Sequence, residues 1–85
     1  MMPTIARFYG MVIKMYFRQV EHNPPHFHVI YGEYLGVFAI ATLEMIEGDL
    51  PNKAQGLIIE WGKKHQVELQ RMWDTQEFVK LPPLK

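Results

Sequence analysis

Residues 27–40 read FHVIYGEYLGVFAI, and this stretch decides the fold. Two runs of β-branched and aromatic residues flank Gly32-Glu33, and a glycine in the first position of a two-residue connection indicates a type II′ turn. The sequence therefore predicts a β-hairpin of strands 27–31 and 34–40. The turn also predicts the register, in which three pairs of residues face each other: Tyr31 and Tyr34, Val29 and Gly36, and Phe27 and Phe38.

The two faces of this hairpin differ in character, because successive side chains of a strand point to opposite sides. One face is fully apolar and is the expected packing surface for helices, with Phe27, Val29, Tyr31, Phe38 and Ile40. The other face combines two histidines with apolar side chains, and an apolar outer face indicates that a partner or second subunit covers it. We predict that its residues bind a partner: His26, His28, Ile30, Leu35 and Val37.

The sheet is also predicted to include the segment that precedes the hairpin. Residues 5–17 read as two strands, Ile5–Phe8 and Met11–Phe17, with a bend or bulge at Gly10 between them. Pro24-Pro25 excludes regular structure, so the preceding segment is read as a loop. A short apolar piece, Leu43–Ile46, follows the hairpin and is expected to end at Gly48.

The second half of the chain has helical periodicity. Asp49 or Leu50 is expected to cap a helix that has Pro51 in its first turn. Apolar residues then recur at helical spacing and predict helices near 50–63 and 66–78, or one kinked helix, since Gly62 and the polar residues after it weaken the middle. The predicted fold is α+β, a small antiparallel sheet followed by these helices packed on one face, in a single domain 1–85.

Composition excludes several functional classes. Nine basic and nine acidic residues cancel in 85 residues, which argues against a non-specific binder of nucleic acid or of a membrane surface. The absence of cysteine excludes disulfides, thiolate metal sites and cysteine nucleophiles. The N-terminus lacks signal-peptide features, and the apolar run 8–17 contains Lys14 and is too short to span a bilayer. The expected location is the cytoplasm.

The one concentration of chemistry is the segment His22-Asn23-Pro24-Pro25-His26-Phe27-His28. On a strand, His26 and His28 point the same way, about 7 Å apart, and His22 could join them from the loop. Three imidazoles meet the minimum for catalytic zinc, and two can serve as acid and base on a phosphate. The alternative is that imidazoles on a half-polar sheet face pack and hydrogen-bond, or form an interface.

We favour the interface interpretation, and we predict no cofactor. Glu21 is the one carboxylate local to the segment, so a metal site would lack outer-shell support. His65 is expected on the helical layer, on the other side of the sheet, and Trp61 and Trp73 fit the apolar helix stripe as core residues. Catalytic or metal-binding roles for His22, His26 and His28 stay as the alternative.

A second candidate surface, for RNA, lies on the first strands. Basic and aromatic residues of the first strands, which are Arg7, Tyr9, Lys14, Tyr16 and Arg18, have the character of an RNA-binding surface. Three charges are few, and charged residues also protect a solvated edge strand against aggregation. Nucleic acid is therefore a secondary expectation among the partners.

Several short motifs together resemble the bacterial domain-of-unknown-function 4160 family across nearly the whole chain. They are Met2-Pro3-Thr4-Ile5, Arg7-Phe8, Gly10, the His22–His28 segment, Tyr31-Gly32-Glu33-Tyr34, Glu47-Gly48, Leu50-Pro51, Ala54, Glu60-Trp61, His65, Glu68-Leu69 and Trp73. The chain departs from the family after Trp73, where Asp74–Val79 is shorter than the usual glycine-containing connection.

The resemblance implies a small intracellular protein that is encoded beside a second small protein, in pairs that look like toxin–antitoxin modules. We therefore expect a protein-binding member of such a two-gene module, which forms a homodimer when no partner is present and has no membrane contact. The alternative is a small ribonuclease-type toxin that uses His26 and His28, with His22, as acid–base residues.

Overall fold

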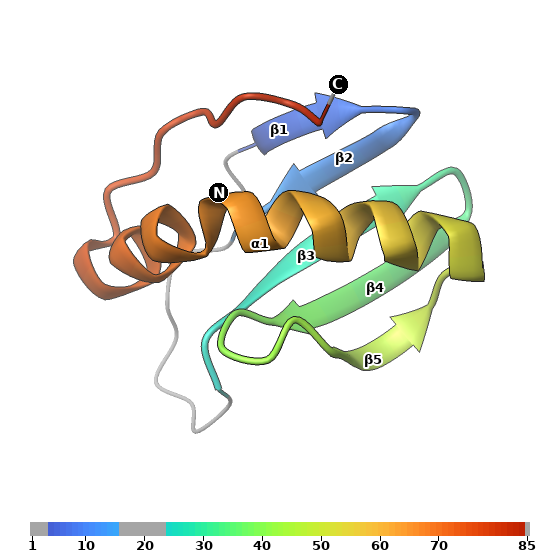
Figure 1. The fold of residues 1–85 in the computed structure, drawn as a ribbon, viewed down its shortest axis with the longest axis horizontal. Coiled ribbons are helices and arrows are strands. Elements are labelled where there is room, and N and C mark those ends of the chain that lie inside the picture. The colour runs from blue at the N-terminus through green and yellow to red at the C-terminus, as the bar shows by residue number, and fades with distance from the viewer. Residues whose placement is uncertain (1–3, 16–23, 85) are drawn as a thin grey trace.

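The computed structural model describes residues 4–15 and 24–84. Five strands precede one long helix: β1 (Thr4–Phe8), β2 (Met11–Lys14), β3 (His26–Tyr31), β4 (Tyr34–Ala39), β5 (Met45–Asp49) and α1 (Asn52–Thr75). Neighbouring strands are antiparallel, and their order in the sheet follows the chain. The helix crosses one face of this sheet (Figure 1). The predicted α+β fold is confirmed.

The central hairpin has the predicted register. The pairs Tyr31–Tyr34, Val29–Gly36 and Phe27–Phe38 face each other across β3 and β4. Gly32 opens the turn at a φ of 60°, in the left-handed region that glycine enters without strain. The rings of Phe27 and Phe38 are stacked with centroids 5.7 Å apart. Turn chemistry and cross-strand packing therefore agree on one pairing.

The bend expected at Gly10 is a two-residue turn between β1 and β2. Tyr9 and Gly10 have φ values of 50° and 78°, and positive φ at both central residues is the signature of a type I′ hairpin. The irregularity lies inside β1 instead, where the register shifts between Thr4 and Ala6. β2 ends at Lys14, earlier than predicted, and residues 16 and 17 lie outside the described residues.

A fifth strand is present where the sequence indicated only a short apolar piece, Leu43–Ile46. β5 begins at Met45 and runs through Gly48, whereas Leu43 lies in the preceding turn with a φ of 60°. Ile46 is an extra residue, since Met45 pairs with Phe38 and Glu47 with Val37. The strand continues through Gly48. This glycine has a φ of 100°, and it permits the close approach of β5 to β4.

One helix is present rather than two, with an internal kink. His65 has non-helical angles (φ −124°, ψ 18°), three residues after Gly62. The predicted cap is wrong, because Asp49 is the last residue of β5 and Pro51 is the N-cap. The predicted end at residue 78 is also wrong, since Gln76 adopts a left-handed conformation and its N–H bonds to the Met72 carbonyl.

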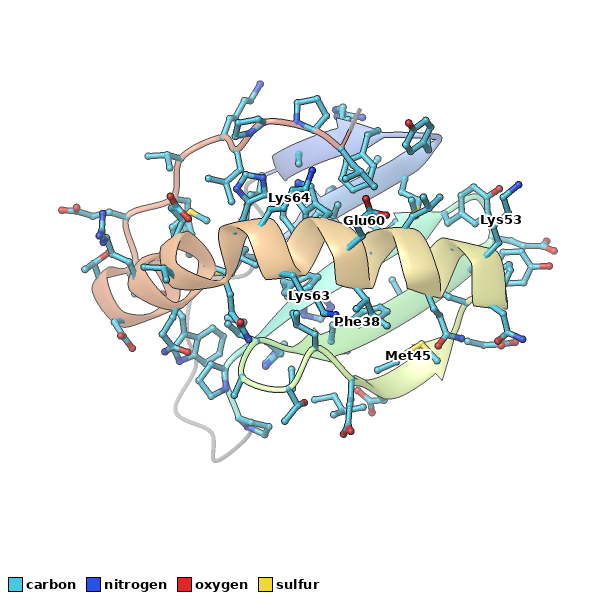
Figure 2. The ribbon with its side chains drawn as sticks, in the orientation of Figure 1. Phe38, Met45, Lys53, Glu60, Lys63 and Lys64 are labelled. Carbon is cyan, nitrogen blue, oxygen red and sulfur yellow. The ribbon has the colours of Figure 1, made fainter. Side chains whose placement is uncertain are left out.

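The core lies between α1 and the sheet. Trp61 is fully buried, and its ring packs against Phe8 and Phe27 with centroids 5.7 and 5.9 Å away. Figure 2 shows Phe38 beside α1, over the sheet. The Trp61 indole N–H donates to the carbonyl of Pro82 at 2.9 Å, which ties the C-terminal tail to the core. No helix in the described residues is long and apolar enough to span a membrane.

Candidate functional site

The face of the sheet opposite α1, called here the outer face, is organised in rows that cross the strands. Strand pairing aligns one row through Lys14, His28, Val37 and Glu47. A second row runs through Arg7, Val12, Ile30, Leu35 and Asp49. Residues paired in this way point to the same side of a sheet. The outer face therefore has basic residues on β1 and β2, apolar residues in its centre and acidic residues on β5.

The five predicted partner-binding residues all belong to the outer face. Leu35 is 51% exposed, which is high for a leucine in a strand, and the neighbouring Ile30 is half-buried. Val37 is only 8% exposed and lies beneath this surface. Sequence analysis missed Val12, which pairs with Ile30 and extends the apolar centre onto β2. The β2–β3 register could not be read from the sequence, because a long loop connects these strands.

His26 and His28 are brought together on this face, as the strand periodicity predicts. Their ring centroids are 5.2 Å apart, with the ring planes at 70°. The Nδ1 of His26 lies 2.8 Å from the Pro24 carbonyl oxygen, which can only accept, so this nitrogen carries the proton. The lone pair of neutral His26 is therefore on Nε2. His22 lies outside the described residues.

Two further side chains join the histidines, and the sequence analysis assigned neither to them. Trp73, expected in the core, is half-buried, and its ring centroid lies 5.0 Å from that of His26. This happens because α1 continues past the end of the sheet (Figure 1), where its last turns have no strand beneath them. Glu47 interacts electrostatically with His28, so Glu21 is not the one carboxylate near the segment.

A family model described as domain of unknown function (DUF4160) matches residues 10–74. This range covers most of the chain and includes β2 to β5, nearly all of α1 and, apart from Arg7, all the residues named above in the two rows. The chain belongs to the DUF4160 family. No curated protein and no solved structure matches it at a significant level.

His28 of the DUF4160 chain has a perturbed ionisation. Its pKa lies below the ordinary value of 6.5 because burial disfavours the charged imidazolium. The neighbouring His26 lowers the pKa of His28 further, and the Glu47 carboxylate acts in the opposite direction. His28 is therefore held mainly in its neutral form near pH 7.

Acidification should destabilise the fold through His28. As the pH falls below about 6.5, the unfolded chain takes up the proton first, so the free energy of unfolding decreases until the folded pKa is passed. Thermal unfolding followed from about pH 8 to about pH 5 should show this decrease. A His28→Asn variant should lose that part of the pH dependence, whereas His65→Asn, on the helix side, should retain it. An unchanged pH profile in His28→Asn would contradict this assignment.

The described residues do not bring a third metal-ligating side chain to His26 and His28. Residues 4–15 and 24–84 contain no group of three His, Cys, Asp or Glu side chains placed to hold a metal ion. A pocket of about 560 Å³ lies elsewhere, lined by Tyr9, Met11, Tyr31, Pro51, Lys53, Ala54 and Leu57. Neither His26 nor His28 lines it. His65 packs on Trp61, with centroids 5.2 Å apart, in the helical layer where it was expected.

The proposed basic and aromatic surface is divided in the structure. Arg7 and Lys14 lie on the outer face, in neighbouring rows. Tyr9 instead lies in the β1–β2 turn and lines the pocket on the helix side. Tyr16 and Arg18 lie outside the described residues. The described part of this surface therefore offers two cations on the outer face, with Tyr9 on the helix side.

Proposed function

We propose that this DUF4160 chain is a small cytoplasmic protein that binds another protein through its outer face, as one member of a two-gene, toxin–antitoxin-like module. The observation that carries the proposal is the apolar centre of that face, where Leu35 is 51% exposed beside Ile30. A contiguous group of apolar side chains on a protein surface marks binding sites. His26 and His28 border this centre and supply rings and hydrogen-bonding groups.

The face is a better binding surface than either edge of the sheet. On the β1 side, the tail donates a hydrogen bond from the Leu81 N–H to the Ile5 carbonyl at 2.8 Å, so part of this edge is already paired. On the β5 side, the strand carries the extra residue Ile46 and exposed acidic residues, including Glu47. Bulges and charges of this kind protect edge strands from pairing with another chain.

The alternative function is a ribonuclease-type toxin, and one observation favours it. The two rings of His26 and His28 are 5.2 Å apart, and Lys14 occupies the position beside His28 on β2. One imidazole could take a proton from a ribose hydroxyl and the other protonate the leaving oxygen, with the lysine beside the phosphate. In this function His26 would act through Nε2, since its Nδ1 is bonded to Pro24.

The double variant His26→Ala/His28→Ala separates the two functions. If these residues belong to a binding face, the affinity for the protein encoded by the neighbouring gene should fall about tenfold or more, as expected for contacts worth about 1.4 kcal/mol. Titration calorimetry on the purified pair measures this change. Zinc content after purification without chelator should stay far below one ion per chain, because two strand imidazoles leave coordination incomplete.

A matched control variant accompanies this test, and two results would contradict the protein-binding function. His65→Ala removes an imidazole of the same size that packs on Trp61, and it should leave the affinity unchanged. If the double variant instead abolishes RNA cleavage or cell toxicity while the affinity stays intact, the ribonuclease function is correct. Stoichiometric zinc bound through His22, His26 and His28 would give priority to metal chemistry.

A further inference from the structure

We infer that, when no other partner is present, a second copy of this chain occupies the outer face, with the β1–β2 side of each copy over the β5 side of the other. This inference rests on the proposed function, in which the outer face binds protein, and it names one occupant and its orientation. The inference follows from the distribution of charge and apolar surface along the rows defined above.

The charges of the outer face are separated by strand. Arg7 and Lys14 lie on β1 and β2, while Glu47 and Asp49 lie on β5, at the other side of the sheet. Val12, Ile30 and Leu35 fill the space between them. With strands about 4.8 Å apart, the basic and acidic sides are separated by about 15–19 Å. The face is therefore a polarised surface with an apolar centre.

A polarised face is complementary to itself in one orientation of a two-fold axis. If the axis runs parallel to the strands, β1 of one copy lies over β5 of the other. Arg7 and Lys14 of each copy then face the acidic side of the other copy. If the axis runs across the strands, β1 lies over β1, and like charges meet at both sides. Like-charge contacts are unfavourable and exclude wrong pairings. The charge pattern therefore selects the axis parallel to the strands.

The size of the face predicts a weak association. Five strands of about five residues cover roughly 400 Å² in projection. Specific interfaces bury about 800 Å² of accessible surface on each partner, so this contact is near the low end of the range. Such a dimer dissociates readily, which leaves the outer face available to the neighbouring gene's product. Self-association and partner binding are then mutually exclusive.

Charge reversal on each side of the sheet tests the orientation. Arg7→Glu/Lys14→Glu makes both sides acidic, and Glu47→Lys/Asp49→Lys makes both sides basic. Sedimentation equilibrium from micromolar to millimolar concentration should show each variant associating with itself at least about tenfold more weakly than the wild type. An equimolar mixture of the two should form a heterodimer, and the chain with all four changes should dimerise again. Thermal unfolding confirms that each variant is folded.

The outcomes separate this inference from the proposed function. A wild-type chain that stays at 10.0 kDa throughout overturns the inference, as does self-association that neither double variant weakens, or a mixture that forms no heterodimer. Binding of the neighbouring gene's product to a strictly monomeric chain would leave the proposed function standing alone. Charge-dependent dimerisation without any binding of that product would overturn the proposed function and leave this inference standing.

Discussion

Replacing Gly48 with alanine should reduce the free energy of unfolding by about 4 kcal/mol, among the largest effects of a single substitution. Gly48 has a φ of 100°, where an L-residue is strained. An added Cβ would overlap with the carbonyl oxygen of Leu35 and lie 2.8 Å from the Cα of Gly36. Backbone atoms cannot move aside as a flexible side chain can, so β5 must separate from β4.

Gly32→Ala is the matched control for this prediction. Gly32 also has positive φ, at 60°, but an added Cβ meets nothing within 4 Å. Its cost should be limited to the left-handed backbone, about 1 kcal/mol. Urea unfolding of the two variants measures the difference, since total stability is about 5–15 kcal/mol for such domains. Equal losses in both variants would contradict the close approach of β5 to β4 at Gly48.

The sequence predicted the parts of the fold that depend on local chemistry. The turn at Gly32-Glu33 determined the register of β3 and β4, and alternation from that register placed His26, His28 and Leu35 on one face. The helix was found through its apolar period, and its weak middle was located near Gly62, close to the kink at His65. In each case residues a few positions apart contain the relevant information.

The remaining features depend on contacts between distant parts of the chain. Gly48 was read as the end of a short apolar piece, since nothing local shows that β4 passes so close to it. Glu47 reaches the row of His28 only through the β4–β5 register, which the extra residue Ile46 shifts. Trp73 follows the helix stripe, but the stripe does not show where the sheet ends beneath it. The register of strands joined by long loops, and the length of the helix relative to the sheet, are determined by contacts between distant residues.

A single thiol can test whether the outer face binds a protein. The chain contains no cysteine, so Leu35→Cys introduces the one thiol of the protein. Leu35 lies at the apolar centre of the face and is 51% exposed. The control is Val67→Cys, because Val67 is 71% exposed on α1, away from the outer face. Both thiols should react freely with an alkylating reagent in the isolated chain at sub-micromolar concentration.

The decisive measurement is the alkylation rate of each thiol with and without the protein encoded by the neighbouring gene. With that protein at about ten times its dissociation constant, the thiol of Leu35→Cys should react about tenfold more slowly, because only the unbound fraction is accessible. The thiol of Val67→Cys should keep its rate. If the two proteins form a complex in which the thiol of Leu35→Cys reacts as fast as in the isolated chain, the outer face is not the binding surface.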